Sequence, residues 1–399
     1  MGKEQLDNQL ISVEEAKVIV EKVVKPLKTE SVSLTDAQGR FLAEDVLSTV
    51  YIPPFNRSAM DGFACRKEDL KRPLSLIGTL AAGDSTKYQI KEGECVRIMT
   101  GASVPDGADT VIMVENTREN DGKVEFLKDD TKSNISPKGE DLKPGDLLVC
   151  KNTLLRSSHI AALASSGIAK VEVYQKASVA IISTGSELIE PGSELLEGQI
   201  YNSNGYQLKA RLKELGFDAL NYGVKKDDYQ TLKEEIESAV TNHDLLVVTG
   251  GVSVGDYDYI PAIVKELGFE IHFSKMSAKP GKHTLFASKE DKYILGLPGN
   301  PVSTFIQFEE CGQWILHAMC NRCFQPLRIE MEIAYHHRRK RSDRFELFPV
   351  CIAGDGQIQS LTYHGSAHMH ALTQANALME IPEGINELNP GDKVYVRPL

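Results

Sequence analysis

No apolar run in this chain approaches the roughly 18 residues that a membrane-spanning helix needs, and the N-terminus lacks the apolar segment of a signal peptide. We therefore predict no membrane contact and a cytoplasmic location. A disulfide framework is also missing, because the seven cysteines are odd in number and scattered, which fits a reducing compartment. Cys320 and Cys323 form a C-x-x-C pair, but no second pair stands at zinc-finger spacing, so we expect no metal there.

An excess of positive charge is absent as well. The formal net charge is −11, which argues against nucleic acid or an anionic membrane as the main partner. A small anionic ligand would need a local basic patch to offset this field. Internal repeats and low-complexity segments are also lacking. At 399 residues the chain should form about two to four domains.

Changes in apolar pattern predict a multidomain protein of the α/β plus β class. A capping box at Ser12-x-x-Glu15 opens a helix, and a β-rich stretch of short alternating runs follows. The apolar runs 179–182 and 245–248 then alternate with amphipathic helices, which indicates a doubly wound, mostly parallel sheet. Alternation returns near the end and predicts a small β-barrel-like domain. The expected domains are a helix and linking α+β domain (1–45 with 147–176), a β-rich domain (46–146), an α/β domain (177–326) and a C-terminal β domain (327–399).

The most informative motif is the glycine-rich turn from Thr249 to Gly255, between a buried strand and a helix. Such a turn directs free backbone N–H groups and the positive end of the helix dipole at its ligand, which favours an anion. Asp256 and Asp258 close the same turn, so a phosphate with a divalent cation fits it. The plainer alternative is a tight turn in which glycine only relieves backbone strain.

Three further segments carry candidate chemistry. The loop 275–283 holds Lys275, Lys279 and Lys282, and its Pro-Gly centre can aim the last two at an anion. The second segment is the stiff turn 297–303, which follows another apolar strand and opens a helix at Pro301. In the third, Asp61 lies in an irregular segment near a possible partner, Arg57. A solvated loop, a rigid connection and an ordinary Asp-Gly turn are the respective alternatives.

Taken together, these motifs closely resemble the molybdopterin molybdenumtransferase family, that of MoeA and the gephyrin E domain. The resemblance covers nearly the whole chain, and the motifs stand in the family's order. They are PPFNRSAMDGFA, RIMTGA, KGEDLKPGD, ISTGSEL, YNSN, TGGVSVGDYDY, AKPGK, LPGNPVS and the looser GSAHMHALTQANALMEIPEG.

The resemblance implies an elongated homodimer of four-domain subunits with a molybdopterin-binding α/β domain. Its active site would lie in a cleft completed by the β-rich domain of the other subunit. The implied reaction converts adenylated molybdopterin and molybdate into molybdenum cofactor and AMP, with Mg²⁺ as the cofactor. Tungstate is a tetrahedral dianion of similar size and fits the same site. A molybdopterin adenylyltransferase-type protein and molybdoenzyme chaperones are further conceivable partners.

The resemblance, with the residue chemistry, also assigns the site. Two carboxylates about 4 Å apart repel by about 4 kcal/mol at an effective dielectric of 20, so a cluster of ionised acids needs a cation such as Mg²⁺ or raised pKa values. Asp61, Thr100 and Asp141 would come from the other subunit. The catalytic candidates are Asp61, Asp141, Asp227, Asp258, Lys279 and Lys282, with Asp61, Asp227 and Asp258 on the metal. The ligand-binding candidates are Thr100, Glu187, Thr249, Gly250, Gly251, Ser253, Gly255, Pro298, Pro301 and Ser366.

One departure from the family pattern weakens the expected hold on an oxyanion. Ser136 stands where the family usually has arginine, and Lys138 can replace only the charge, since it lacks the bidentate fork. Two other functions stay open at this point. One is adenylyl transfer from ATP to molybdopterin on the same α/β module, and the other is a gephyrin-like scaffold that anchors a partner protein.

Overall fold

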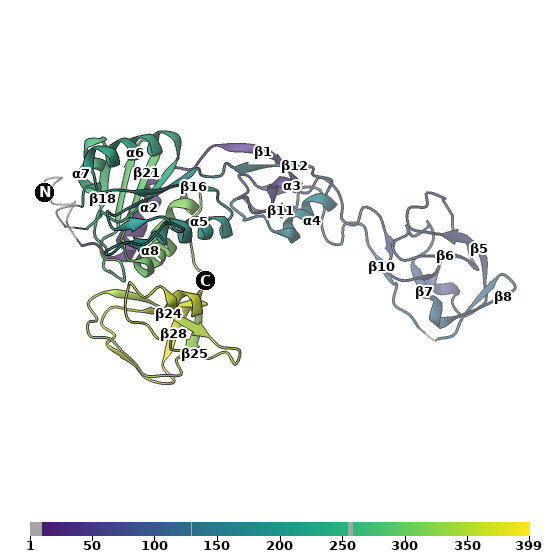
Figure 1. The fold of residues 1–399 in the computed structure, drawn as a ribbon. Coiled ribbons are helices and arrows are strands. Elements are labelled where there is room, and N and C mark those ends of the chain that lie inside the picture. The colour runs from purple at the N-terminus through teal and green to yellow at the C-terminus, as the bar shows by residue number, and fades with distance from the viewer. Residues whose placement is uncertain (1–9, 129, 254–257) are drawn as a thin grey trace. The chain divides into compact units, whose positions relative to one another are not determined.

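The computed structural model describes residues 10–128, 130–253 and 258–399 (Figure 1). The chain divides into two compact units. One unit comprises Met1–Glu30 and Tyr174–Leu399, and the other comprises Ser31–Val173. Within the described ranges, none of the helices combines the length and the hydropathy that crossing a membrane requires.

The first unit is built on a six-stranded sheet with the order β16-β13-β17-β21-β20-β18. The first four strands pair in parallel, and β20 runs antiparallel to both of its neighbours. Every residue of β13 and β17 is buried, which accounts for their uninterrupted apolar sequences. The mostly parallel sheet is thus confirmed. The strands are β13 (Val179–Thr184), β16 (Ala219–Lys225), β17 (Leu245–Thr249), β18 (Glu270–Phe273), β20 (Leu285–Lys289) and β21 (Lys292–Leu297).

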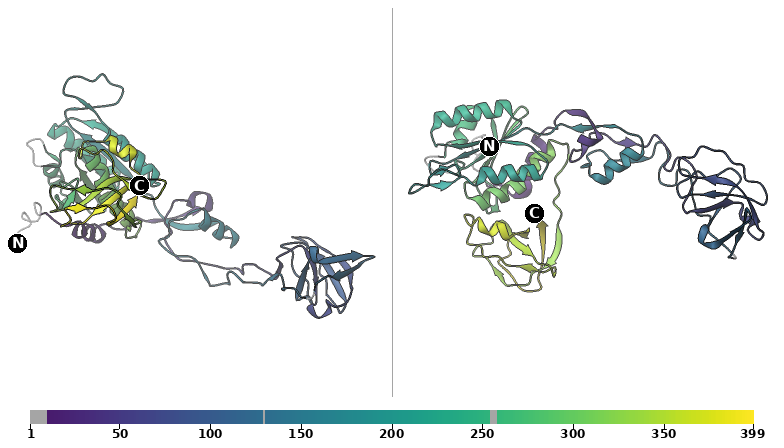
Figure 2. Two further views of the ribbon diagram at one scale, coloured as in Figure 1. Left: turned by 90° about the horizontal axis from the view of Figure 1, so that it is seen from below. Right: turned by 45° about the vertical axis from the view of Figure 1, so that its right-hand side comes forward.

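Helices cover both faces of this sheet (Figures 1 and 2). Successive residues of a strand point to opposite faces, so Ile181 joins the core under α2, α5 and α9, whereas Ile182 joins the core under α6 and α7. The N-terminal helix α2, grouped above with the linking segment, packs here through Ala16 and Val20 on the α/β core. The helices are α2 (Val13–Val23), α5 (Asn204–Glu214), α6 (Tyr229–Asn242), α7 (Ile260–Glu266), α8 (Pro301–Gln307) and α9 (Gln313–Ala318), and two short strands, β14 (Leu188–Ile189) and β15 (Ile200–Tyr201), form a separate pair.

Two features of this unit differ from the sequence-based expectation. Strand β20 was not predicted, because its turn to β21 consists of Glu290 and Asp291 and offers no glycine or asparagine signal, although Glu290 has a φ of 54°. The helix predicted to begin at Pro301 is interrupted by a π-helical turn, η3 (Phe308–Gly312). This turn carries the buried acids Glu309 and Glu310.

A second sheet forms the C-terminal part of the same unit, in the order β19-β24-β26-β28-β22. Its core is apolar and includes Val350, Met379 and Val396. Strand β19 belongs to the loop 275–283, the lysine loop, and it pairs in parallel with β24. Closure of this sheet into a barrel stays a prediction. The elements are β19 (Ala278–Lys279), β22 (Ile329–Glu332), β23 (His337–Arg338), β24 (Phe345–Ile352), β25 (Ile358–Gln359), α10 (His370–Gln374), β26 (Ala377–Ile381), β27 (Glu387–Leu388) and β28 (Lys393–Pro398).

The second unit is mostly β-structure, as the interrupted alternating runs predict. Its largest sheet has the order β7-β4-β6-β5-β9-β8, with apolar cores on Val96 and Phe63. A further core around Leu42 and Leu163 joins α4 to short strands. The elements are β1 (Thr29–Ser33), α3 (Leu34–Ala37), β2 (Val46–Leu47), β3 (Arg57–Ser58), β4 (Gly62–Cys65), η1 (Lys67–Asp69), β5 (Leu74–Leu80), β6 (Glu94–Ile98), β7 (Thr110–Met113), η2 (Val114–Asn116), β8 (Thr117–Asn120), β9 (Lys123–Phe126), β10 (Ile135–Ser136), β11 (Leu147–Val149), α4 (Ser157–Ser165) and β12 (Lys170–Tyr174).

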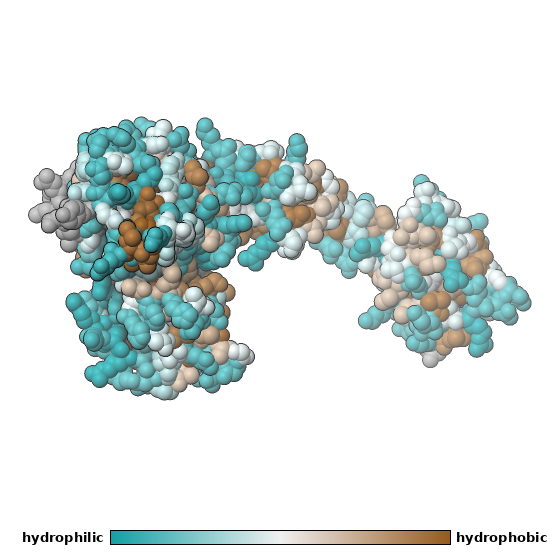
Figure 3. All heavy atoms as spheres, viewed as in Figure 1, coloured by the Kyte–Doolittle hydropathy of each residue, from teal (hydrophilic) through white to brown (hydrophobic). Residues whose placement is uncertain are grey.

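Polar side chains cover most of the visible surface, with apolar patches among them (Figure 3). Leu196 and Ile200, near the short strands β14 and β15, are 62% and 55% exposed.

Candidate functional site

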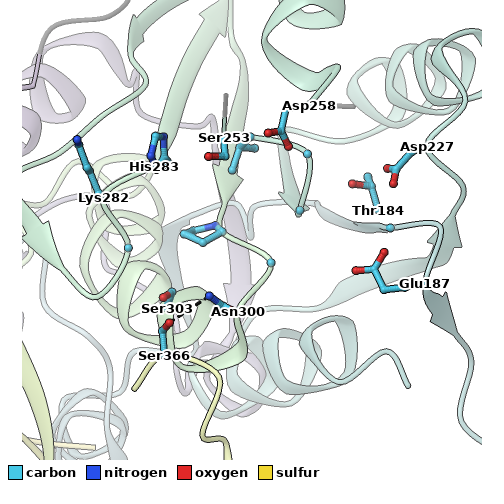
Figure 4. A pocket seen from close by; sticks show the side chains of 17 residues that line it. Thr184, Glu187, Asp227, Ser253, Asp258, Lys282, His283, Asn300, Ser303 and Ser366 are labelled. Atoms are coloured by element: carbon cyan, nitrogen blue, oxygen red, sulfur yellow. Dashed lines mark hydrogen bonds between the residues drawn. The ribbon is translucent and has the colours of Figure 1, made fainter. Parts of the chain in front are cut away.

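A cavity of about 480 Å³ lies at the carboxyl ends of the parallel strands in the first unit (Figure 4). Ligands of open α/β sheets bind at this edge. The cavity is lined by residues that follow β13, β16, β17 and β21, by the lysine loop and by one C-terminal residue. They are Thr184, Gly185, Glu187, Asp227, Gly250, Gly251, Val252, Ser253, Asp258, Gly281, Lys282, His283, Pro298, Gly299, Asn300, Ser303 and Ser366.

Strand register explains why these turns meet. Ser183 pairs with Thr249, and Thr249 pairs with Leu297, so β13, β17 and β21 end level with one another. The turns that follow therefore begin side by side. Gly250 N–H donates to the Leu297 carbonyl at 3.0 Å, which ties two of the turns together.

The turn after β17 approaches β13 so closely that only glycine fits. Gly250 has a φ of 89°, and a Cβ built there would lie 2.4 Å from the Thr184 carbonyl oxygen. Gly251 has a φ of 63°, and its Cβ would lie 3.0 Å from Thr184 Oγ1. Within the described residues, this Oγ1 is buried and has no hydrogen-bond partner. The glycines thus let backbone amides and a buried hydroxyl share the cavity floor.

The turn after β21 is held rigidly. Thr304 Oγ1, on α8, donates to the Pro298 carbonyl at 2.5 Å, and Asn204 Nδ2, on α5, donates to the Gly299 carbonyl at 2.7 Å. Asn300 Nδ2 donates to Ser366 Oγ at 3.1 Å. The cavity wall is therefore fixed from two helices and joined to the C-terminal segment.

Acidic side chains line one side of the cavity, and a lysine and a histidine line the other (Figure 4). Glu187, Asp227 and Asp258 are the acids, and Asp227 Oδ2 accepts the Ser186 N–H at 3.0 Å. Lys282 and His283 stand opposite. Burial lowers the pKa of His283, and Lys282 and Lys275 lower it further.

The three acids do not form a ready-made metal cage. In the parts of the chain that the structure describes, no group of three or more His, Cys, Asp or Glu side chains could hold an ion. Mg²⁺ usually takes one or two carboxylates and completes its shell with water and substrate phosphates. The donor set therefore fits a magnesium ion that arrives with a phosphate ligand.

Lys279 lines a neighbouring cavity of about 610 Å³ rather than the first one. Its Nζ lies 2.9 Å from Oε1 of Glu346, a carboxylate that is 4% exposed. Gly281, Ser303 and Ser366 line both cavities, so they form the wall between them.

Three predicted site residues lie in the second unit. Asp61 Oδ1 accepts the backbone N–H of Thr100 at 2.6 Å and its hydroxyl at 2.8 Å, and these bonds lower the pKa of Asp61. Asp141 N–H donates to the Ile52 carbonyl at 2.9 Å. In the same unit Lys138 Nζ lies 4.4 Å from the centre of the Tyr51 ring, a cation–π contact.

The remaining predicted residues divide as follows. The first cavity brings together Glu187, Asp227, Gly250, Gly251, Ser253, Asp258, Lys282, Pro298 and Ser366. Thr249 is buried beneath the turn, and Pro301 opens α8. Gly255 lies outside the described residues. Sequence reasoning missed Thr184, His283, Asn300 and Ser303, all of which stand inside motifs it had singled out.

Comparison with known families matches nearly the whole chain in three consecutive parts. Residues 11–167 match the MoeA N-terminal region (domain I and II). Residues 180–318 match a probable molybdopterin binding domain, and residues 336–399 match the MoeA C-terminal region (domain IV).

Individual relatives agree. A molybdopterin molybdenumtransferase from Haemophilus influenzae is 32% identical over 390 residues, which cover 95% of this chain and 96% of the relative. One from Staphylococcus aureus is 38% identical and covers 92% and 90%. The crystal structure of a molybdopterin biosynthesis MoeA protein from Pyrococcus horikoshii OT3 is 30% identical, with a TM-score of 0.84 over 98% of this chain and 100% of that one.

Proposed function

Because the chain belongs to the molybdopterin molybdenumtransferase family and is thus a transferase of molybdenum cofactor biosynthesis, we propose that it transfers molybdenum from molybdate to adenylated molybdopterin and releases AMP. The observation that carries the proposal is the cavity at the level ends of β13, β17 and β21. It joins a glycine turn suited to phosphate with acids suited to a metal ion.

The phosphates of the substrate would bind the turn after β17. Gly250 and Gly251 keep this turn free of side chains, so backbone N–H groups can approach an oxyanion. The Thr184 hydroxyl, which lacks a partner within the described residues, adds a donor at the same place. Lys282 supplies positive charge on the opposite side.

Asp227 and Asp258 would hold Mg²⁺ together with substrate phosphates, and Glu187 lies on the same side of the cavity. When bound, the ion would polarise the phosphoanhydride and neutralise charge on the phosphates. These acids repel one another less once a cation is shared between them.

Molybdate would bind in the cavity that contains Lys279. In the described parts of the chain, five Lys or Arg side chains line that cavity against one acid, Glu346, so a dianion is attracted there despite the net charge of −11. Ser366 and Gly281 border both cavities, so the anion would bind next to the molybdopterin substrate.

A second copy of the chain would complete the site with Asp61, Thr100 and Asp141, so the working form would be a homodimer. The Asp61 carboxylate is already oriented by Thr100, which supports a role for the pair together. The cytoplasm is the proposed compartment, in keeping with seven free cysteines.

AMP release tests the proposal. The purified full-length chain, given adenylated molybdopterin, Mg²⁺ and molybdate, should release AMP and yield cofactor that reactivates a molybdenum-free apoenzyme. Omission of molybdate should abolish the reactivation. Asp227→Asn should lower both readouts, whereas the matched control Asp291→Asn, an exposed acid outside the cavity, should leave both unchanged.

Other outcomes would favour a different function. Pyrophosphate release from ATP and free molybdopterin would favour adenylyl transfer. Intact binding of adenylated molybdopterin without AMP release would remove the proposed transferase step. Stoichiometric capture of a partner protein without any cofactor chemistry would favour a scaffold.

A further inference from the structure

The cavity that contains Lys279 has an unusual charge pattern. Its cationic lining consists of Lys279, Arg338, Arg339, Lys340 and Arg344. Among the residues that the structure describes, Glu346 is the one acid in the lining, and its side chain is 4% exposed. A buried acid in an otherwise cationic cavity lowers the attraction for an anion, so its presence needs a reason.

Glu346 holds two of these cations at once. Its Oε1 lies 2.9 Å from Lys279 Nζ, and its Oε2 accepts a hydrogen bond from Arg339 Nη1 at 3.3 Å. Arg339 is also anchored by the carbonyls of Arg344, Pro382 and Ile385. These hydrogen bonds hold Arg339 in place. Lys279, whose side chain is 39% exposed, is the cation that can exchange partners.

The fold places Lys279 and Glu346 opposite each other. Strands β19 and β24 pair in parallel, and their register sets Lys279 beside Glu346. Arg344 Nη1 donates to the Ala278 carbonyl at 3.1 Å, which fixes the same contact from the other strand. The ion pair therefore links the lysine loop to the C-terminal sheet.

We propose that Glu346 is a positioning residue that limits how tightly this cavity binds molybdate, by competing with the anion for the Lys279 ammonium. The inference rests on the proposed function, which places molybdate in this cavity. An anion held by Lys279 as well as by the exposed Arg338 and Lys340 would bind tightly and leave slowly. With Glu346 present, molybdate must displace the carboxylate from Lys279, so it stays loosely held and can move on to the adjoining cavity.

Molybdate binding to the full-length protein, measured by calorimetry without adenylated molybdopterin, tests this proposal. Glu346→Gln removes the charge with almost no change in shape, and we expect about ten-fold tighter molybdate binding. The matched control is Glu332→Gln, which removes the same charge from an exposed site on β22 and should change the affinity by less than about two-fold.

Anion charge separates competition for Lys279 from direct repulsion by Glu346. Perrhenate is a tetrahedral oxyanion like molybdate but carries a single charge. Displacement of the carboxylate from Lys279 costs the same free energy whichever anion takes its place, so Glu346→Gln should tighten perrhenate binding by about ten-fold as well. Direct repulsion would scale with the anion's charge, so a change of only about three-fold for perrhenate would contradict the proposal. In turnover, KM for molybdate should fall while kcat does not rise.

A double-mutant cycle tests the route through Lys279. In a Lys279→Gln background, the further change Glu346→Gln should alter molybdate affinity by no more than about three-fold. An undiminished effect in that background would show that Glu346 does not act through Lys279.

Glu346→Asp covers the case in which Glu346→Gln does not fold. Aspartate keeps the charge for Arg339 but is one methylene too short to hold Lys279 as well, so molybdate should again bind more tightly. Unchanged or weaker binding in whichever variant folds would overturn the proposal. Wild-type protein that binds molybdate but releases no AMP would contradict the proposed function instead. Failure of the proposed function can therefore be distinguished from failure of the proposal for Glu346.

Discussion

Replacing Gly250 by alanine tests how closely the turn after β17 must approach β13. The backbone has a φ of 89°, and the new Cβ would lie 2.4 Å from the Thr184 carbonyl oxygen. A left-handed backbone costs a residue other than glycine about 1–2 kcal/mol. Forcing the carbonyl away adds about 1–3 kcal/mol, as overpacking does elsewhere. We expect the free energy of unfolding to fall by about 2–5 kcal/mol.

Gly268→Ala is the matched control. Gly268 has a φ of 81°, but the nearest atom to its added Cβ is Lys289 Nζ at 3.6 Å, an ordinary contact. This variant should lose only the conformational part, about 1–2 kcal/mol. The difference between the two variants therefore measures the close approach itself.

Trp314 provides the assay, because it is the chain's single tryptophan and lies 3% exposed in the core that contains Val247 and Leu295. Its fluorescence during urea unfolding reports on this unit of the protein. AMP release per folded molecule should also fall in Gly250→Ala and not in Gly268→Ala. Equal stability of the two variants would refute the reasoning.

Three further predictions concern acids, a buried ion pair and pH. Asp258→Asn should lower AMP release by about 100-fold, because it removes a group that stabilises developing charge. Its unfolding midpoint should be unchanged, and a comparable loss of stability would contradict the assigned role. Arg397→Met leaves Glu310 and Glu380 buried without this cation, and the free energy of unfolding by urea should drop by about 3–5 kcal/mol, whereas a loss below about 1 kcal/mol would contradict this. Burial, with Arg322 adding to it, lowers the pKa of His317 to about 4, so below about pH 6.5 the unfolded chain binds a proton that the folded chain does not. Stability should therefore fall by roughly 3 kcal/mol as the pH drops from about 6.5 to 4, and His317→Gln should flatten that dependence; an equal slope in the variant would refute the assignment.

The α/β core could be predicted from sequence because its signals are local. Strands β13 and β17 are buried on both faces, and this shows directly as continuous apolar runs. Their glycine turns mark the strand ends, and parallel pairing then brings those ends together. The location of a cavity at this edge follows from that geometry, whereas the lysine loop and Ser366, which also line it, come from distant parts of the chain.

The features that sequence could not supply depend on contacts distant in the chain. Lys279 and Lys282 stand three residues apart, yet they line different cavities because β19 pairs with β24. No local sequence pattern indicates that Glu346 will contact Lys279. The regular apolar periodicity after Pro301 also gives no sign of the π-helical turn that interrupts this helix.

The most direct test of the central claim is a crystal structure of the full-length protein with adenylated molybdopterin. The account predicts that the pyrophosphate lies within hydrogen-bond distance of the backbone N–H groups that follow Thr249, with Asp227 and Asp258 facing it across a metal ion. A pyrophosphate bound away from the ends of β13, β17 and β21 would contradict it.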